Sequence, residues 1–356
     1  DWNTMFEVEK DAGVWDFTLK SLEYDDYKTL IALISRVLWD PKKFKSVSVK
    51  DAIGPLTERA KDLIEHLPLI MDGVTWDVMS AYELVNNWNH VLLSKRYTQR
   101  VSGKVMCDAM EEALLKAGAN FVFGAELLDV QYGKKDFVAK FSDERMIKDG
   151  ILFLCLDNSP ALDLLGNNWG PDADAKLRRS TYGAINVLLD YDQPIKMKSD
   201  LEVSIETKWN LQPKVLSDGK TVSCVICDLG KEVLSSDPET IKNEVVRQLR
   251  LPQPTSIRIG WGAEWKENKW NFSQSSGVLS LEGQLPFFGK CSKVAMCGMM
   301  SPRHTPYSSI EASVEVSRAL SHMCFGTRKP LKPILVTHVG MLTLVLLIVL
   351  LLVYRR

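Results

Sequence analysis

The C-terminal segment places the strongest constraint on what this chain can become. From Pro333 to Tyr354 the sequence contains no acidic or basic residue except one histidine. A helix rises about 1.5 Å per residue, so this run would extend roughly 33 Å, enough to cross the hydrocarbon core of a bilayer. Basic residues lie on both sides of it, within 326–332 and at Arg355 and Arg356, where they suit the headgroup region. We therefore expect a transmembrane helix over 333–354, with Pro333, Tyr354, Arg355 and Arg356 at the membrane boundaries.

The rest of the chain has the composition of a folded globular protein. Of its 356 residues, 46% are hydrophobic and 25% are charged, which are ordinary values for such proteins. A chain of this length is too long to fold around one simple hydrophobic core, so we expect two domains, interleaved or consecutive. Lys and Arg number 44 and Asp and Glu 45. We expect no nucleic-acid partner, because this balance leaves no excess of positive charge to bind phosphates.

The position of the apolar segment also predicts a topology. The opening residues, DWNTMFEVEKD, do not form the apolar core of a signal peptide. The simplest interpretation is a single-pass C-terminal anchor whose folded part faces the cytosol. The lipid bilayer would then be one partner, at an organelle outer membrane, the endoplasmic reticulum or an internal membrane of a virus.

The cysteines do not predict a disulfide framework or a metal site. There are seven, an odd number, at irregular spacing. Cys224 and Cys227 form a C-x-x-C pattern inside TVSCVICDL, which alternates like a buried strand. Residues three apart on a strand face opposite ways, so one metal ion could not easily reach both sulfurs. We interpret these cysteines as small buried side chains, and we expect no metal.

The first part of the chain has helical periodicity. Residues 1–100 place apolar side chains at helical spacing, and four of the five tryptophans of this part are expected to anchor its packing: Trp15, Trp39, Trp76 and Trp88. A further helix is predicted between Ser102, which suits an N-cap, and Gly118, which suits the position after the C-cap.

Beyond Gly118 the period changes to two, which indicates strands. One helix interrupts them, opened by Ser236 or Asp237 with Pro238 in its first turn. Arg303 and His304 are expected in an exposed loop. Strands and helices that alternate in mixed order are typical of an α/β or α+β protein whose elements return to a shared sheet.

Several stretches of the chain follow one another in a recognisable order: SGKVMCDAMEEALLKAGANFVFGAELLDV, GILFLCLDNSPALDLL, STYGAINVLLDYDQPI, CVICDLGKEVLSSDPETIKNEVVRQL with PTSIRIGWGAEW, and KVAMCGMMSPRHTPYSSIEASVEVSRAL. Over residues 100–325 they resemble the flavin-containing amine oxidase family, which includes the tail-anchored monoamine oxidases. Residues 1–100 resemble the helical cap of that family's substrate domain less specifically.

The resemblance implies a mixed α/β fold. An incomplete FAD-binding, Rossmann-like domain would be interleaved with an amine-oxidase-type substrate domain. The implied boundaries are a helical cap at 1–100, a remnant of the FAD-type domain at 101–160, a substrate-type β-sheet domain at 161–290, a closing FAD-type strand and helix at 291–325, a linker at 326–332 and the transmembrane anchor at 333–354.

The resemblance also implies a site. If FAD binds, it would be held non-covalently, and the residues implied to contact it are Leu127, Gly298, Ile310, Glu311 and Ala312. The family's lysine near flavin N5 is replaced by Asn186 in this sequence. The aromatic residue that packs against the amine aligns with Ser309, for which Tyr307 is an approximate replacement.

The sequence departs from the family where FAD would be bound. A dinucleotide site needs a glycine-rich turn that lets backbone amides approach the pyrophosphate, and residues 1–356 contain no G-x-G-x-x-G. Met299 follows Gly298, where the family usually has an acidic residue. Hydrolytic motifs such as G-x-S-x-G and H-E-x-x-H do not occur either.

Two hypotheses remain, so the sequence leaves open whether the protein is an enzyme. The first is a membrane-anchored amine oxidase that acts on a primary or secondary amine with O₂, its FAD gripped by a glycine-rich unit outside residues 1–356. The second is a non-catalytic relative with a structural or assembly role, bound to protein partners in a large complex or a membrane-containing virion. The residues Asn186, Met299 and Ser309 favour the second.

Overall fold

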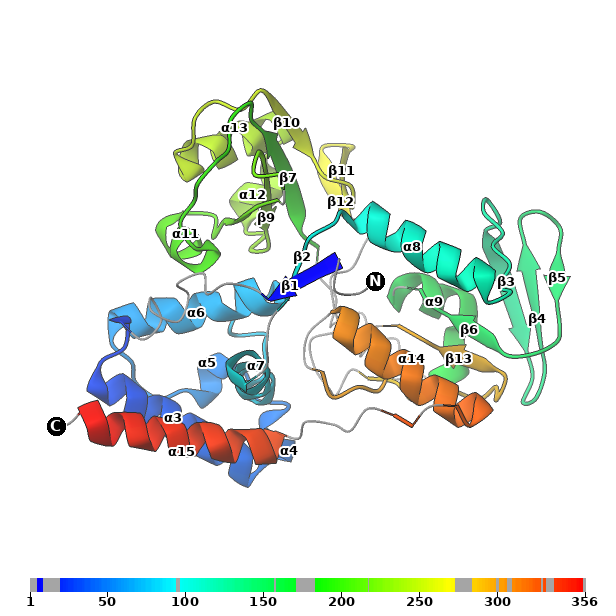
Figure 1. Ribbon diagram of the computed structural model, residues 1–356, viewed down its shortest axis with the longest axis horizontal. Coiled ribbons are helices and arrows are strands. Elements are labelled where there is room, and N and C mark those ends of the chain that lie inside the picture. The colour runs from blue at the N-terminus through cyan, green and yellow to red at the C-terminus, as the bar shows by residue number, and fades with distance from the viewer. Residues whose placement is uncertain are drawn as a thin grey trace.

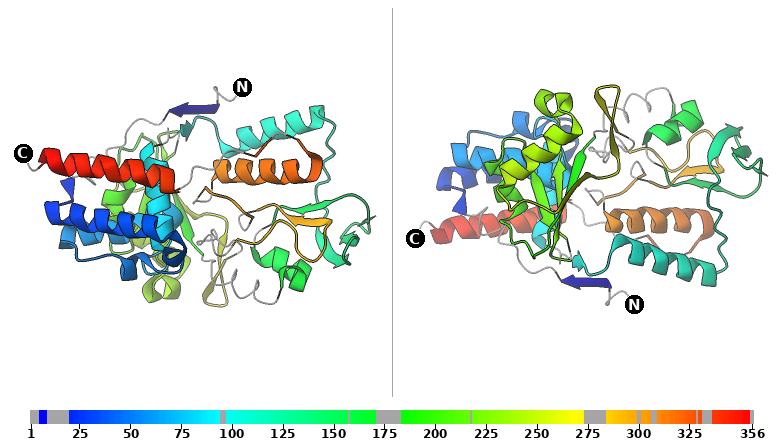
Figure 2. Two further views of the ribbon diagram at one scale, coloured as in Figure 1. Left: turned by 90° about the horizontal axis from the view of Figure 1, so that it is seen from below. Right: turned by 90° about the horizontal axis from the view of Figure 1, so that it is seen from above.

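The computed structural model describes most of the chain. The described residues are 5–8, 20–93, 97–156, 158–170, 183–216, 218–272, 284–298, 301–305, 309–327, 329–330 and 336–354. In all three views, helices α3 to α7 and the sheet that contains β7 lie in one half of an elongated molecule (Figures 1 and 2). Helices α8 and α14 and strands β3 to β6 lie in the other half, so the chain passes from one half to the other several times.

A layer of helices forms the first hydrophobic core. Its helices are α3 (Tyr24–Trp39), α4 (Pro41–Phe44), α5 (Val49–Ala52), α6 (Glu58–Asp72) and α7 (Ala81–Leu93). Along α3, the buried residues Leu30, Leu33, Ile34 and Val37 follow the spacing of one helix face. The buried carboxylate of Asp26 accepts hydrogen bonds from the Thr57 amide (2.8 Å) and hydroxyl (2.8 Å), which ties the start of α3 to the start of α6.

The tryptophans of this layer only partly follow the expectation. Trp76 and Trp88 are half-buried and pack against the helical core. Trp39 is 91% exposed, so the prediction that it anchors packing is wrong. It is the last residue of α3 and lies off the face that carries Leu33 and Val37, so helix geometry turns it to solvent. Trp15 lies outside the described residues.

Helix α15 (Val336–Tyr354) lies along this layer and contacts α3 and α7. Its half-buried residues Leu344 and Leu347 pack against the helical core. Within the part of the chain that the structure describes, no helix qualifies as long and apolar enough to cross a membrane.

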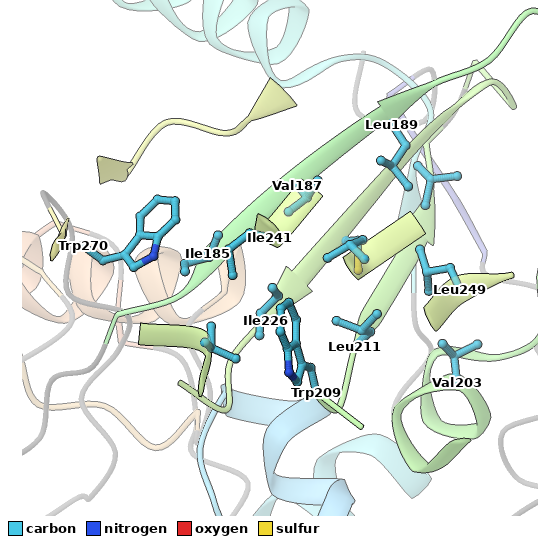
Figure 3. Close-up of a cluster of buried hydrophobic side chains, with 14 of the residues drawn as sticks. Ile185, Val187, Leu189, Val203, Trp209, Leu211, Ile226, Ile241, Leu249 and Trp270 are labelled. Atoms are coloured by element: carbon cyan, nitrogen blue, oxygen red, sulfur yellow. The ribbon is translucent and has the colours of Figure 1, made fainter. Parts of the chain in front are cut away.

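An antiparallel sheet forms the second core. Its strands are β7 (Ile185–Asp190), β8 (Gln212–Val215), β9 (Thr221–Ile226) and β10 (Ser256–Ile259), in the order β10-β7-β9-β8. Ile185, Val187 and Leu189 alternate along β7 and are fully buried in a cluster that includes Ile241 and Trp270 (Figure 3). This period of two is the pattern of a sheet with one covered face.

Short helices and a hairpin complete this sheet unit. They are α11 (Asp200–Glu206), α12 (Lys231–Ser235), α13 (Pro238–Leu249), β11 (Ala263–Lys266) and β12 (Lys269–Phe272). The Asp237 side chain caps α13 by accepting from the Thr240 amide at 2.9 Å, and Pro238 occupies the first turn, as predicted.

The other half of the molecule contains a short parallel pair of strands. Its elements are α8 (Gly103–Lys116), β3 (Leu127–Tyr132), β4 (Phe137–Phe141), β5 (Met146–Ile147), β6 (Leu152–Leu154), α9 (Asn158–Leu165), η1 (Gly166–Trp169), β13 (Val294–Met296) and α14 (Ile310–Phe325). Strands β3, β4 and β5 form an antiparallel meander, whereas β6 pairs in parallel with the distant β13. Ser102 caps α8 as predicted, by accepting from the Val105 amide.

Strand β1 (Phe6–Val8), near the N-terminus, pairs antiparallel with β2 (Tyr97–Gln99).

The predicted mixed α/β class is confirmed. The parallel strand pair is built from segments on either side of the antiparallel sheet in the sequence, so the two units are interleaved.

The fold predicts that Leu189 is a major contributor to the stability of the sheet. Replacement of this fully buried residue by alanine leaves a cavity, and we expect Leu189→Ala to lower the free energy of unfolding by about 2–5 kcal/mol. Leu234→Ala is the matched control, because Leu234 on α12 is 42% exposed and should change stability by no more than about 0.5 kcal/mol. Urea denaturation measures both, and equal effects would contradict the placement of β7.

Candidate functional site

The carboxyl ends of β6 and β13 form the place where an open α/β sheet usually binds its ligand. The chain leaves β13 through Cys297 and turns at Gly298. A Cβ atom at Gly298 would lie 3.0 Å from the carbonyl oxygen of Leu156, so a larger residue here would require a small shift of the backbone. The strand ends therefore lie close together and leave little space between them.

The turn after Gly298 is closed by hydrogen bonds within the chain. The Gly298 amide donates to the Ser301 hydroxyl oxygen at 3.1 Å, and the Ser301 amide donates to the Gly298 carbonyl at 3.0 Å. The buried Ser301 hydroxyl in turn donates to the Met296 carbonyl at 3.0 Å. The amide of Gly298 is thus already engaged, and it does not point freely at a ligand.

Helix α14 begins next to this turn with a cap of its own. The Ser309 hydroxyl accepts from the Ala312 amide at 3.2 Å, which satisfies one of the free amides of the helix N-terminus. Ala312 is buried, Ile310 is half-buried and Glu311 is exposed in the first turn. The positive end of the helix dipole is complemented by Glu311.

Asn186 is held within the antiparallel sheet. Its side-chain oxygen accepts from the Ser223 hydroxyl on β9 at 3.0 Å, and its carbonyl accepts from the Gly260 amide at 2.7 Å. A Cβ atom at Gly260 would lie 3.1 Å from the Asn186 Cβ, so the loop after β10 passes close over this residue. Asn186 therefore has a structural role in joining β7 to β9 and β10.

The remaining predicted site residues are spread over the molecule. Leu127 begins β3 and is half-buried against the core beneath β6. Tyr354 ends α15 and is 73% exposed. Tyr307, Pro333, Arg355 and Arg356 lie outside the described residues, as does Met299. The structure thus brings Gly298 and the start of α14 into one region, and it places Asn186 in the separate sheet.

A buried polar cluster that the sequence did not predict lies between the helical layer and α14. The Asn87 amide group donates to the Asp72 carboxylate at 2.9 Å. Glu83 and Arg303 are buried, and the charge of Arg303 acts on both acids. The expectation that Arg303 is exposed is wrong, because the interior acids compensate its charge. In AYELVNN, Glu83 and Asn87 are spaced four apart on the apolar face, a signal that could have revealed the cluster.

A cavity of about 330 Å³ adjoins this cluster. Its lining includes Gln284, Phe287, Arg303, His304 and Glu315. The Glu315 carboxylate accepts from the His304 amide at 2.7 Å and from the Thr305 amide at 3.0 Å, which fixes the loop before α14. The loop that lines this cavity contacts the helical layer through Asn86, whose side-chain amide donates to the His304 carbonyl at 3.3 Å.

Burial perturbs the acids of the cluster. It raises the pKa of Asp72 to about 6, although the hydrogen bond from Asn87 and the charge of Arg303 oppose the shift. Burial, and then the charge of Asp72, raise the pKa of Glu83 well above its ordinary value. Two acids that share a buried site cannot both ionise easily, and such groups mark either a functional site or a structural network.

Comparison with known proteins supports the fold. No family model matches the sequence, and no curated protein matches it. Among solved structures, a variant of putrescine oxidase matches with a TM-score of 0.59 and 13% identity, over 90% of this chain and 77% of that one. An oxidoreductase from Methanosarcina mazei matches with a TM-score of 0.58 and 13% identity, over 86% of this chain and 74% of that one. At these identities the likeness shows that the chain has the fold of flavin amine oxidases and related oxidoreductases.

The buried acids predict a specific pH dependence of stability. Because the pKa of Asp72 is raised on folding, the folded state keeps a proton that the unfolded state releases near pH 4. The stabilisation is complete below that pH and is lost as the pH rises to about 6. Asp72→Asn should therefore gain stability over the wild type across this window, by at most about 3 kcal/mol at pH 7.

Urea denaturation at a series of pH values measures this difference. Asp77→Asn is the control, because it removes the same formal charge from an exposed site on the neighbouring loop. An Asp72→Asn difference that stays constant from pH 4 to pH 7 would contradict the burial of this carboxylate.

Proposed function

We propose that this protein is a non-catalytic member of the amine-oxidase-type fold, held at a membrane by its C-terminal segment and used as a scaffold for protein partners in a larger assembly. A large complex or a membrane-containing virion would suit this role. One observation carries the proposal: two backbone amides at the place of a flavin, those of Gly298 and Ala312, are already satisfied within the chain.

The residues present do not fit a flavin well. FAD needs free backbone amides for its diphosphate and a close approach of the closing helix to its ring. Ser301 occupies the amide of Gly298, and Ser309 occupies the amide of Ala312. Asn186, which stands where the family has a lysine, is engaged by Ser223. These three contacts support the proposal that the chain keeps the fold but does not use the cofactor.

The alternative is an active FAD-dependent amine oxidase, and one feature of the structure favours it. Among the described residues, β6 pairs with β13 alone, so its other edge is open to a further strand. Helix α8 has no buried residue, and its side chains Val105, Met110, Leu114 and Leu115 are 46–50% exposed. A glycine-rich strand–turn–helix unit from outside residues 1–356 could cover both surfaces and grip FAD there.

The membrane part of the proposal rests on the outer face of α15. The residues that face away from the helical layer are apolar and 43–65% exposed: Val345, Leu346, Ile348, Val349, Leu350, Leu352 and Val353. Transfer of such side chains from water to lipid is favourable by about 25 cal/mol per Å². The buried residues of the helical core come from α3 to α7 and the loop between α6 and α7. Helix α15 could therefore leave this layer for a bilayer and keep the core intact.

The proposal predicts a colourless protein. After purification in detergent and incubation with excess FAD, followed by gel filtration, the full-length protein should carry less than about a tenth of an equivalent of flavin by absorbance, because the amides that FAD needs are engaged. Putrescine oxidase, treated in the same way, is the positive control. A stoichiometric flavin spectrum would overturn the non-catalytic proposal and favour the alternative.

The anchor predicts a change in partitioning when it is removed. Deletion of residues 333–356 should move the protein from the membrane pellet to the supernatant of alkaline carbonate extraction, because the folded part would lose its hydrophobic attachment. Val345→Arg should weaken the attachment, since Val345 is exposed and lies near the middle of 333–354, and a charge near the centre of a span costs about 3 kcal/mol.

The matched control for this change is Val314→Arg on α14, a similarly exposed apolar position in the folded part, which should leave the partitioning unchanged. If the protein without residues 333–356 remained in the pellet, the C-terminal anchor would be excluded.

A further inference from the structure

Two cysteines meet at the carboxyl edge of the parallel strand pair. Leu154 of β6 lies opposite Met296 of β13, and the Cys297 amide donates to the Leu154 carbonyl at 2.9 Å. Cys155 and Cys297 are the next residues on their two strands. The parallel register therefore places them next to each other, although they are far apart in the sequence.

Both cysteines lie on the same face of the strand pair. Along the strands, Leu154 and Met296 point into the core beneath α9, whereas Phe153 and Ala295 point into the core beneath α14. Because successive side chains alternate, Cys155 and Cys297 share the α14 face. Cys297 packs against the core beneath α14, and Cys155 is exposed to solvent at the edge of the same face.

The two thiols are free and adjacent. No disulfide joins the two cysteines, and the strand register places their side chains beside each other. The hydrogen bond from Cys155, aided by the nearby Ser317, lowers the pKa of Cys297 to about 7. The same hydrogen bond is the largest cause of a raised pKa at Cys155, and burial is the second. A thiolate would therefore form first on Cys297, with Cys155 as its proton donor.

We propose that Cys155 and Cys297 form a thiol–disulfide exchange site, in which Cys297 is the attacking thiol and Cys155 the resolving thiol. The co-reactant is a small disulfide of the glutathione disulfide class. Neighbouring strands hold their Cα atoms about 5 Å apart, which lies within the range that a disulfide requires. The oxidised form links β6 covalently to β13. It would therefore fix residues 291–325 to the half of the molecule that contains β3 to β6.

The exchange balances in two steps. The Cys297 thiolate attacks one sulfur of the small disulfide, a new S–S bond forms, and one thiolate leaves and takes up a proton. Cys155 then loses its proton to solvent, and its sulfur attacks Cys297. The second small thiolate leaves as the Cys155–Cys297 disulfide forms. Overall two protein thiols are oxidised and one small disulfide is reduced to two thiols.

Three of the other described cysteines lie away from this pair and provide controls. Cys107 is exposed on α8, and Cys224 and Cys291 are buried in separate cores. Cys324 belongs to the same core as Cys297, but it lies seven residues beyond Ser317 on α14, which is about 10 Å along the helix. Cys107→Ser is therefore the matched variant that should change nothing.

The test uses the reduced full-length protein in detergent, with glutathione disulfide as the probe. After quenching with an alkylating reagent, peptide mass spectrometry should detect a cross-linked Cys155–Cys297 peptide in the wild type. Cys155→Ser should instead retain one glutathione on Cys297, because the resolving thiol is absent. Cys297→Ser should form neither product, and Cys107→Ser should behave like the wild type.

The pH profile of alkylation gives a readout that a purely structural role would not change. Between pH 6 and pH 8 the alkylation rate of Cys297 should rise about tenfold, whereas an ordinary thiol rises by about 75-fold over the same interval. Absence of the cross-linked peptide in the wild type, or a rise typical of an ordinary thiol, would overturn the proposal. The wild-type measurement needs no substitution, so it stands even if a variant fails to fold.

Discussion

The pairing of β6 with β13 is the contact on which the rest of this half of the molecule depends. It joins Leu152–Leu154 to Val294–Met296, and the residues of the antiparallel sheet unit lie between these two segments in the sequence. Such a non-local pairing carries a large entropic cost of loop closure, which must be offset by the cores on its two faces. Because it forms, the Gly298 turn, the start of α14 and the two contacting cysteines come together at one edge.

The same pairing would allow the proposed scaffold to keep its fold without a cofactor. A fold is maintained by its cores, whereas a site depends on a few groups at the strand ends. In this chain Ser301 and Ser309 satisfy the amides of Gly298 and Ala312. These internal hydrogen bonds would stabilise the strand ends without a ligand, as the proposed scaffold role requires. The open edge of β6 and the exposed face of α8 remain surfaces that another unit could cover.

Local features of the fold could be predicted from the sequence, and non-local ones could not. The caps at Ser102 and Asp237 depend only on residues three positions away, so short-range patterns revealed them. The burial of Arg303 depends on Asp72 and Glu83, which are more than two hundred residues away in the sequence. The contact of Cys155 with Cys297 depends likewise on strand register. At the candidate site, the positions of Gly298 and α14 followed from the family resemblance, but their internal hydrogen bonds required the structure.

Hydrogen–deuterium exchange at the amides of Gly298 and Ala312 tests the central claim most directly. The full-length protein in detergent would be compared with and without added FAD. We predict that both amides exchange slowly in the absence of FAD, because their hydrogens are bonded within the chain, and that FAD changes neither rate. Fast exchange that becomes slow when FAD is added would contradict the account, since it would show that these amides are free to grip the cofactor.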